Sequence, residues 1–306
     1  MKDLIGRIKR YIQEAEDFDP DLAMEVANFQ LLNNPVYGRF ARRKGIGRIG
    51  KLEEIPFLPV EFFKYEEVFS CGLHEGYFLS SGTGGDRSRV YYNQESLALY
   101  RASALRSFPF KGERVYSLIP PFRIFPRSSL SFMLSLFPGV QYLNLSYEIS
   151  PEEVFNALYG REGVVFSTST QLLRLIQWLK RKEKTLMGEF KWIETGGYKG
   201  LGLKYHRRSL HREASSVIPQ AQFWSEYGMA ELFSQFYAPS REGYRPHPYA
   251  VVFTKGKGLF RVFDFANLCT VSALLVPDMV EVEESGAFHV LGRISEEERG
   301  CGYVFR

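Results

Sequence analysis

The sequence predicts an α/β fold, because two kinds of segment alternate along most of its 306 residues. From about residue 75, short β-like runs are each followed by a run whose apolar residues recur at helical spacing. That order predicts a largely parallel sheet covered by helices. After about residue 245 only β-like runs occur, separated by glycine, proline or acidic turns. We therefore expect an α/β core in residues 1–245 and a small C-terminal β subdomain with a mobile tail in residues 246–306.

The core begins with a predicted amphipathic helix, because its charges are interleaved with Leu4, Ile5, Ile8, Tyr11 and Ile12. This pattern is not that of a signal peptide. Ser150 and Pro151 are well placed to begin a later helix. The expected strand–helix pairs are 76–81 with 93–108, 113–120 with 128–137, 140–145 with 151–160, 163–169 with 170–184, and 190–197 with a basic helix ending before Pro219. The expected strands of the β subdomain are 249–253, 258–265, 270–276 and 287–292.

The composition is that of a soluble globular protein, with 45% hydrophobic and 24% charged residues. No apolar run approaches the roughly 18 residues that span a bilayer. A net charge of +4 is too modest to indicate nucleic-acid binding. The spacing of His206 and His211 does not suit a zinc site. Cys71, Cys269 and Cys301 are an odd number of cysteines, which argues against a disulfide framework and favours a reducing cytoplasm.

One stretch, GRFARRKGIGRIGK at residues 38–51, is basic and contains no acidic residue. Such a charge run usually forms a solvated face. A docking patch for an acidic partner, such as an acyl carrier, is the alternative. The basic residues are Arg39, Arg42, Arg43, Lys44, Arg48 and Lys51.

A glycine-rich loop, YFLSSGTGGDRSR, occupies residues 77–89. Glycine lets backbone N–H groups approach an anion closely, and the hydroxyl and arginine side chains add donors and charge. The loop lacks the GxxxxGK[ST] pattern of a Walker A loop and the third glycine of GxGxxG. Taken alone, it is equally consistent with a simple turn and with a phosphate-binding loop.

Four motifs in order carry a resemblance to the adenylate-forming enzymes of the ANL superfamily. SSGTGG resembles their phosphate loop, SEYGMAEL their adenine-binding motif, FRVFDFANL the segment of their ribose-binding aspartate, and VLGR the Gly-Arg before their interdomain hinge. IPFLPVEFFK, ETGGYKG and RGC further resemble the acyl-protein synthetase branch, the LuxE-like enzymes and the LuxE/PaaK families. The resemblance runs from about Ile55 to Cys301. It implies an adenylate-forming core that lacks the usual full C-terminal domain.

The resemblance implies that a carboxylate attacks the α-phosphate of ATP, with Mg²⁺ as cofactor, and releases pyrophosphate. A thiol then takes the acyl group from the acyl adenylate. The glycine-rich loop would grip the β- and γ-phosphates, and Arg87 or Arg89 would replace the usual lysine of the family. The loop residues implied are Ser80, Ser81, Gly82, Thr83, Gly84 and Gly85.

For the nucleotide, the resemblance implies an adenine-binding segment followed by a metal ligand. Tyr227 would stack on adenine, and Glu231 would hold Mg²⁺. The structural alternatives are a core tyrosine and a solvated glutamate. Ala230 replaces the more usual threonine, which removes a hydroxyl near the phosphates. The segment comprises Glu226, Tyr227, Gly228 and Met229.

Further binding residues are implied by the later motifs. An ionised Asp264 would accept hydrogen bonds from both ribose hydroxyls, and Arg293 would bind ribose or phosphate. Lys199 would reach phosphate from a loop that passes the adenine edge. Alternatively, Asp264 only shapes a turn, and the two basic residues lie at the surface. The loop that carries Lys199 begins with Gly196, Gly197 and Tyr198.

Cys301 lies near the end of the sequence, where the acyl-protein synthetases carry the acyl group on a cysteine. Its thiolate would be the nucleophile, and a packed, inert cysteine is the alternative. Cys71 and Cys269 are expected to be such packing residues. The chain ends soon after Arg293, so we expect either a branch that works with a shortened tail or reduced activity.

Two other functions stay open. One is a CoA ligase of the phenylacetate–CoA ligase type, although the missing C-terminal domain counts against it. The other is a non-catalytic nucleotide-binding subunit of a reductase or carrier complex. The intact loop, Glu231, Asp264 and Arg293 favour catalysis. The expected partners are a carboxylic acid, most simply a fatty acid, and a fatty-acid reductase or acyl carrier protein; the sequence identifies neither the acid nor the oligomeric state.

Overall fold

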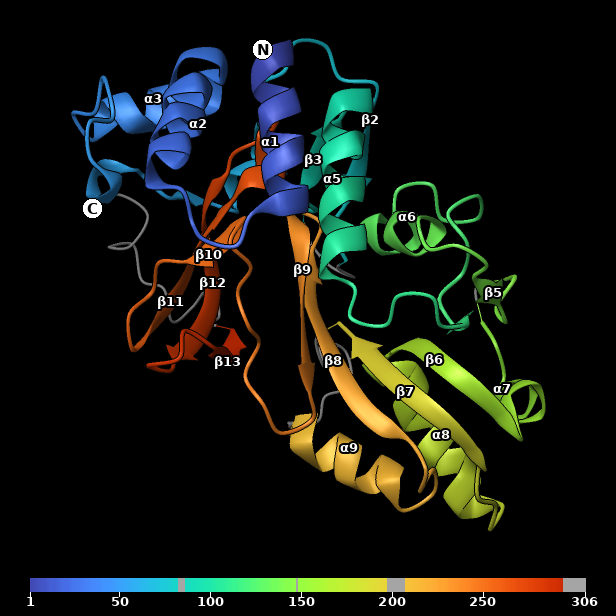
Figure 1. Ribbon diagram of the computed structural model, residues 1–306. Coiled ribbons are helices and arrows are strands. Elements are labelled where there is room, and N and C mark those ends of the chain that lie inside the picture. The colour runs from blue at the N-terminus through green and yellow to red at the C-terminus, as the bar shows by residue number, and fades with distance from the viewer. Residues whose placement is uncertain (82–85, 147, 197–206, 294–306) are drawn as a thin grey trace. The chain divides into compact units, whose positions relative to one another are not determined.

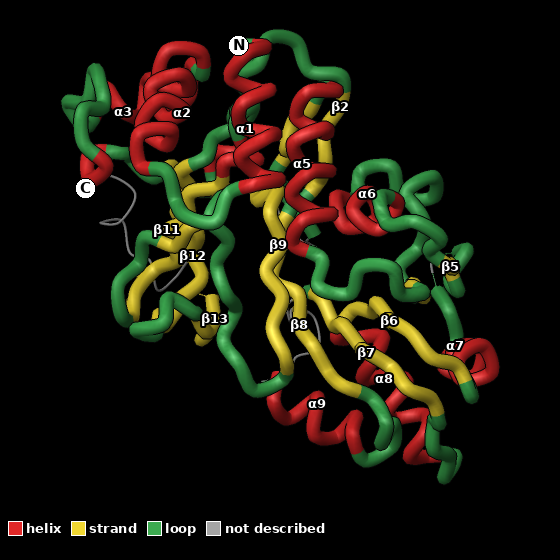
Figure 2. The backbone as a smooth tube through the Cα atoms, viewed as in Figure 1, coloured by secondary structure: helices red, strands yellow, loops and turns green. Residues whose placement is uncertain are grey.

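The chain forms two compact units, which are seen in a computed structural model that describes residues 1–81, 86–146, 148–196 and 207–293 (Figures 1 and 2). The first unit contains residues 1–103 and 231–234 and the chain from residue 244 onward; the second contains residues 104–230 and 235–243. This grouping differs from the predicted division at residue 245, because the C-terminal strands pack with the N-terminal residues. Within the described residues, no helix has the length and apolar character needed to cross a membrane.

The first unit confirms the predicted N-terminal helix and all four C-terminal strands. Helix α1 buries Leu4, Ile8 and Ile12 on one face. Asp19 and Asn34 cap the next two helices, each of which begins with proline. The elements are α1 (Lys2–Glu14), α2 (Pro20–Asn33), α3 (Pro35–Arg43), η1 (Leu52–Glu54), β1 (Leu58–Pro59), α4 (Phe62–Tyr65), β2 (Gly76–Leu79), β3 (Arg89–Tyr92), α5 (Gln94–Ser107, which runs into the second unit), β10 (Ala250–Val252), β11 (Lys257–Asp264), η2 (Phe265–Asn267), β12 (Ala273–Val282) and β13 (Phe288–Arg293).

The sheet of the first unit is built around the ten-residue strand β12. Strand β11 pairs antiparallel with it, and β10 pairs antiparallel with β11. On its other side, β12 pairs with β1 near its start, where Leu58 lies opposite Leu274, and with β13 near its end, where Asp278 lies opposite Arg293. The β1 pair is parallel, and it ties the N-terminal segment to the C-terminal strands. A separate hairpin of β2 and β3 carries the glycine-rich loop.

Cys71 and Cys269 are joined by a disulfide, with their Cα atoms 4.9 Å apart. Both side chains are buried, as a packing role requires, and they contact Phe69. The prediction that they are unpaired packing residues was wrong, because the fold brings together two cysteines separated by 198 positions. The expected reducing compartment rested on unpaired cysteines, so this bond removes that support.

The second unit confirms the predicted parallel sheet. Its strand order is β5-β4-β6-β7-β8-β9, and the pairs β5–β4, β4–β6, β6–β7 and β7–β8 are all parallel. The elements are β4 (Val115–Ser117), α6 (Ser129–Ser135), β5 (Gln141–Tyr142), α7 (Pro151–Leu158), β6 (Arg161–Thr168), α8 (Ser169–Arg181), β7 (Gly188–Thr195), α9 (Arg207–Ser215), β8 (Gln222–Met229) and β9 (Leu232–Pro239, which begins in the first unit).

Local sequence explains where the helices of the second unit begin. Ser150 and Glu153 form a capping box at α7, with Pro151 at its first turn, as predicted. Thr168 and Gln171 form a second capping box at α8. Helices α8 and α9 lie on one face of the sheet (Figure 1). The core between them includes Leu172, Ile176, Leu179, Trp192, Leu210 and Phe223, all buried.

Strands β8 and β9 were not predicted, although β8 carries the predicted adenine-binding motif. The two strands are joined by Ala230 and Glu231 alone. They interleave polar and charged residues with aromatic ones, yet most of these side chains are buried, including Glu226 and Gln235. Simple alternation of apolar and polar residues is therefore lost, which hides both strands from a pattern analysis.

Candidate functional site

The glycine-rich loop is closed at its base by Ser80 and Ser88. Ser80 N–H donates to the Ser88 carbonyl at 3.1 Å, and Ser88 N–H donates to Ser80 Oγ at 3.0 Å. The exposed Arg87 donates from Nε to the Ser80 carbonyl at 2.7 Å. These bonds continue the β2–β3 hairpin, so they hold the two ends of the loop together. Ser81 is also exposed, and residues 82–85 of the loop lie outside the described residues.

Glu231 lies beside this loop base within the same unit. Its side chain is buried, with 6% of its surface exposed. Burial raises the pKa of Glu231, while a hydrogen bond from Ser88 and the positive charge of Arg293 oppose that rise. The prediction grouped the loop, Glu231 and Arg293 in one site, and the structure brings the loop base and these two residues together. It does not support the alternative of a solvated glutamate.

Arg293 is held by an acidic residue that the sequence analysis missed. Its Nε donates to Asp278 Oδ1 at 2.5 Å, and its Nη2 donates to Asp278 Oδ2 at 3.2 Å. The two residues are opposite each other on β12 and β13. A two-point contact of this kind fixes the guanidinium plane. A proline–aspartate pair inside a hydrophobic run was the available signal for Asp278.

Asp264 lies in the same unit but is completely buried. Its carboxylate accepts hydrogen bonds from Ser234 N–H at 2.8 Å, Ser234 Oγ at 2.7 Å and Ala266 N–H at 2.9 Å. Burial raises the pKa of Asp264 to about 6, and these hydrogen bonds oppose the rise. Asp264 thus caps η2 and holds the start of β9, so it shapes a turn, and its acceptor sites are occupied within the protein.

Asn267, at the end of the same turn, completes this arrangement. Its Oδ1 accepts from Phe233 N–H at 2.9 Å, and its Nδ2 donates to the Glu231 carbonyl at 2.8 Å. Together with Asp264, it holds the backbone of residues 231–234 from both ends. The backbone of Glu231 is therefore fixed by the η2 turn.

In the second unit, the two remaining predicted segments are neighbouring parallel strands. Glu194 lies opposite Ser225, and Thr195 lies opposite Glu226, at the carboxyl ends of β7 and β8. Glu194 and Thr195, the first residues of ETGGYKG, therefore lie beside Ser225 and Glu226, the first residues of SEYGMAEL. Ligands of open α/β sheets bind at such strand ends.

These strand ends enclose buried acidic residues. Thr195 Oγ1 donates to Glu226, and Glu194 accepts hydrogen bonds from Ser169 Oγ and from Ser225 Oγ, the latter at 2.5 Å. Burial raises the pKa of Glu226 to about 7; the Thr195 hydrogen bond lowers it, and the charge of Glu194 raises it further.

A buried histidine adjoins this acidic group. His211 Nε2 lies 3.7 Å from Glu194 Oε1, and its Nδ1 lies 2.8 Å from Ser240 Oγ. The sequence indicated only that His211 does not form a zinc site with His206. Glu194 was not predicted, although an acid directly after FKWI, a run with three apolar residues, was a signal for it.

The predicted adenine contact, Tyr227, is partly exposed on β8 and contacts Phe236 with ring centroids 6.4 Å apart. Gly228 lies next to it, and a Cβ there would lie 2.2 Å from Glu226 Oε1, so a larger residue would displace the carboxyl end of Glu226. Met229 ends the strand. Gly196 has a φ of +88°, a conformation that favours glycine.

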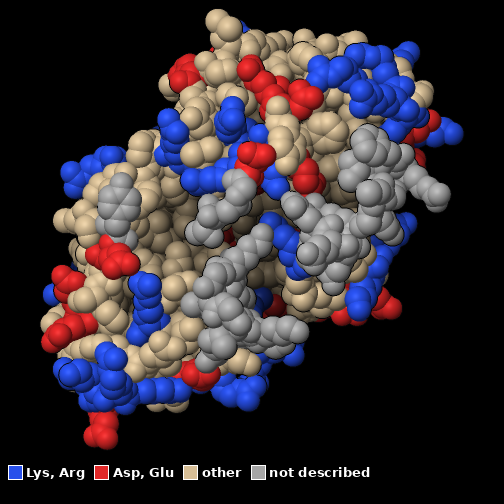
Figure 3. All heavy atoms as spheres, turned by 180° about the vertical axis from the view of Figure 1, so that it is seen from behind, with Lys and Arg blue, Asp and Glu red and all other residues tan. Residues whose placement is uncertain are grey.

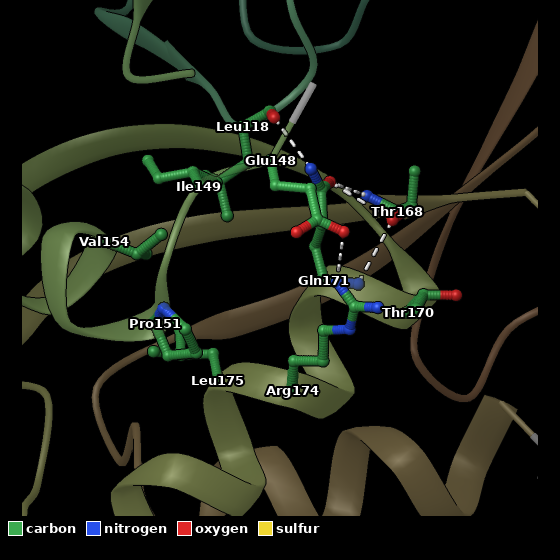
Figure 4. Close-up of a pocket in the computed structure, with 10 residues that line it drawn as sticks. All are labelled: Leu118, Glu148, Ile149, Pro151, Val154, Thr168, Thr170, Gln171, Arg174 and Leu175. Atoms are coloured by element: carbon green, nitrogen blue, oxygen red, sulfur yellow. Dashed lines mark hydrogen bonds and ion pairs between the residues drawn. The ribbon is translucent and has the colours of Figure 1, made fainter. Parts of the chain in front are cut away.

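A pocket of about 180 Å³ lies elsewhere in the second unit, between α7 and the start of α8 (Figure 4). Its apolar lining includes Leu118, Ile149 and Leu175. Gln171 Nε2 donates to the Leu118 carbonyl at 2.8 Å, and Arg174 lies 3.7 Å from Glu148.

The residues present fit Mg²⁺ in one respect. Within the described ranges, no group of three or more acidic, histidine or cysteine side chains could hold a metal ion. Mg²⁺ keeps several waters and binds proteins through one or two carboxylates together with substrate phosphates. One carboxylate beside a loop that holds the phosphates would therefore suffice, and Glu231 lies beside the base of the glycine-rich loop.

Several predicted residues lie outside the described residues. They are Gly82, Thr83, Gly84, Gly85, Gly197, Tyr198, Lys199 and Cys301.

Known structures support this arrangement of strands and helices. ATP-bound MatB from Rhodopseudomonas palustris matches with a TM-score of 0.53 and 16% identity, over 74% of this chain and 49% of MatB. The luciferase-like enzyme of the nonluminescent mealworm Zophobas morio matches with a TM-score of 0.52 and 13% identity, over 80% of this chain and 63% of the enzyme. The fold is that of the adenylate-forming enzyme core. A third structure, VinN in complex with L-aspartate, matches with a TM-score of 0.51 and 12% identity, over 71% of this chain and 59% of VinN.

The chain spans about half to two thirds of the length of these three proteins. No protein-family model and no curated protein matches the sequence.

Proposed function

We propose that this protein uses ATP to convert a carboxylic acid into an acyl adenylate and then transfers the acyl group to a thiol. The observation that carries the proposal is the grouping of the loop base, Glu231 and Arg293 within one unit. A phosphate-binding loop, a carboxylate that holds Mg²⁺ and a guanidinium are groups that bind the phosphates of a nucleoside triphosphate. The adenylate-forming fold is consistent with the same activity.

In the proposed reaction, the substrate carboxylate attacks the α-phosphorus of ATP and pyrophosphate leaves. Both reactants are anions, so the site must neutralise charge and align the two groups. The backbone of the glycine-rich loop and the exposed guanidinium of Arg87 would bind the β- and γ-phosphates. Lys199 would add a second cation. Mg²⁺, held by Glu231, would supply further positive charge at the phosphates.

The ribose contact needs an acceptor that is both ionised and accessible. Asp264 was the sequence candidate, but its oxygens already accept three hydrogen bonds in a buried turn. Asp278 is a second candidate, because its side chain keeps 9% of its surface exposed, whereas Asp264 is completely buried, and because it already binds Arg293. We therefore propose Asp278 as the ribose acceptor and Asp264 as the residue that positions Glu231.

Adenine binding is proposed for the strand edge of the second unit. Tyr227 would stack on the ring, and the loop that begins at Gly196 would pass its edge. The buried Glu226 would act indirectly, since its carboxyl group holds Thr195 at the start of that loop.

For the second step, we propose that the thiol is Cys301 and that the acid is a fatty acid. The Cys301 thiolate would attack the carbonyl carbon of the adenylate; a C–S bond forms, the acyl–phosphate C–O bond breaks, and AMP leaves. A reductase or carrier protein would then receive the acyl group.

The deciding experiment measures pyrophosphate release by the purified protein with ATP, Mg²⁺ and a panel of fatty and aryl acids, followed by intact-mass spectrometry. We expect acid-dependent release and a hydroxylamine-labile adduct at Cys301. The Cys301→Ser variant should release pyrophosphate without the adduct. Acid-dependent release in which CoA alone accepts the acyl group would assign a CoA ligase. ATP binding without release would assign a non-catalytic subunit.

A further inference from the structure

The basic stretch at residues 38–51 forms one surface in the first unit, and the proposed catalytic steps do not use it. We name it the α3 basic surface: Arg42, Arg43, Lys44, Arg48 and Lys51. All five residues are exposed, at the C-terminal end of α3 and in the loop that follows. Figure 3 shows Lys and Arg atoms gathered over this part of the molecule.

Ion pairing differs between α3 and the loop that follows it. Arg39, on the same helix, is neutralised by Glu66 at 3.0 Å. In the part of the chain that the structure describes, no carboxylate lies within ion-pair distance of Arg42, Arg43, Arg48 or Lys51. The side chains nearest in sequence that could oppose them are Glu53 and Glu54, and Glu54 accepts from the backbone N–H groups of Gly50 and Lys51.

An apolar groove of about 410 Å³ adjoins this surface, between α2 and residues 47–48. Leu31 forms part of its wall, and Leu32 is 80% exposed beside it. Arg48 belongs both to the groove and to the α3 basic surface. Asn28 fixes the groove, because its side chain donates to the Ile49 carbonyl and accepts from Ile49 N–H, both at 2.9 Å.

The exposed Leu32 and the cation of Arg48 make this groove suited to an amphipathic helix; Glu25, which also lines it, is paired with Arg7 at 2.7 Å. One or two apolar side chains would enter the groove, and acidic residues around them would face the cations. A flat anionic membrane fits less well, because the apolar contact is recessed between two elements. Long-range attraction between opposite charges would also speed association.

We propose that the α3 basic surface and its groove dock a small acidic carrier protein through one of its helices. This inference rests on the proposed function in one respect, namely that a protein takes part in handling the acyl group. The docking contact itself requires no adenylation, so the two can be tested separately.

The test uses a holo acyl carrier protein as the probe and isothermal titration calorimetry at 50 and 300 mM NaCl. The full chain should bind it, and the higher salt should weaken binding several-fold. Arg43→Glu/Arg48→Glu should raise the Kd at least tenfold at low salt. Lys9→Glu/Arg10→Glu is the matched control, because it makes the same charge change at exposed positions on α1, and it should bind like the parent. Leu32→Ser should weaken binding at both salt concentrations.

Three results would overturn the proposal: equal binding by parent and Arg43→Glu/Arg48→Glu, equal loss in the control variant, or binding of phosphatidylglycerol vesicles but not of the carrier. Pyrophosphate release is measured in parallel and should be unchanged in every variant. Carrier binding without pyrophosphate release would leave the docking surface intact and reject the adenylation. Pyrophosphate release without carrier binding would do the reverse.

Discussion

The buried carboxyl group of Asp264 stabilises the fold, although Asp264 belongs to a motif that predicts ligand binding. Asp264 was matched to a ribose contact by its place in the sequence. In the fold, three hydrogen bonds from Ser234 and Ala266 occupy its oxygens. The sequence could predict an acid at a strand end but not the donors, because Ser234 lies thirty positions away.

The Asp264→Ala variant should lose stability. It removes the cap of η2 and leaves buried N–H groups without an acceptor, which costs about 3 kcal/mol. Denaturant unfolding measures this loss. Asp278→Asn should cost about 1 kcal/mol or less, because the ion pair of Asp278 with Arg293 is partly exposed.

The preference for ATP over its 2′-deoxy analogue distinguishes the roles of Asp264 and Asp278. If Asp278 binds the ribose, Asp278→Asn should lose most of the preference for ATP over its 2′-deoxy analogue, roughly fivefold by the worth of one hydrogen bond. A folded Asp264 variant that loses this preference, while Asp278→Asn keeps it, would restore Asp264 as the ribose residue.

At the scale of elements, close packing of α2 and α3 depends on one glycine. A Cβ at Gly38 would lie 2.7 Å from the Leu31 carbonyl oxygen. Gly6 on α1 has no atom within 4 Å of the same position and is the natural control.

The Gly38→Ala variant should therefore lower the free energy of unfolding by about 1 to 3 kcal/mol, because backbone must move apart. Gly6→Ala should raise it by about 0.5 to 1 kcal/mol through helix propensity. Paired thermal melts test both, and equal shifts in the two variants would show that the α2–α3 contact is looser than described.

The Cys71–Cys269 disulfide links the segment before β2 to the loop before β12. Removing a native disulfide typically costs about 2 to 5 kcal/mol. Cys71→Ser/Cys269→Ser should show this loss, and dithiothreitol should destabilise the parent but not the variant. Unreduced, denatured parent should expose one reactive thiol. Detection of three would show that the bond does not form in solution.

At the scale of the whole molecule, buried acids in both units make stability depend on pH. Glu226 has a pKa of about 7 and Asp264 one of about 6, both raised by burial. Between the unfolded and folded pKa values, the folded chain binds more protons than the unfolded chain. The stability that these two groups contribute is therefore fully present below about pH 4, and it is lost as the pH rises to 7.

Glu226 alone should contribute a fall of about 2 kcal/mol between pH 5 and pH 8. Glu226→Gln should remove that part of the pH dependence, and Glu189→Gln, an exposed glutamate on β7, should leave it unchanged. Urea unfolding at the two pH values measures the difference. A parent protein that gains stability from pH 5 to pH 8 would contradict the prediction, unless Glu226→Gln enlarges the gain.

The overall fold could be predicted to a large extent, because the elements that alternate from residue 76 to residue 215 have clear periodicity and caps such as Ser150. Strands β8 and β9 were not predicted, because buried acidic residues such as Glu226 interrupt the periodicity. The joining of β1 to β12 and of Cys71 to Cys269 also escaped, since both depend on contacts between residues far apart in the chain. The site could be predicted as motifs, but Asp278 could be identified only through its contact with Arg293.

The parallel pairing of β1 with β12 also governs what happens while the chain is being made. Leu58 leaves the ribosome more than 200 residues before its partner Leu274. At typical synthesis rates this interval lasts roughly 10 to 40 seconds. The second unit is almost continuous in sequence and can form its sheet during that time. The apolar faces of α1 and α2, in contrast, stay uncovered until the last strands have been synthesised. The N-terminal segment of the nascent chain is therefore the part most exposed to chaperones and to aggregation.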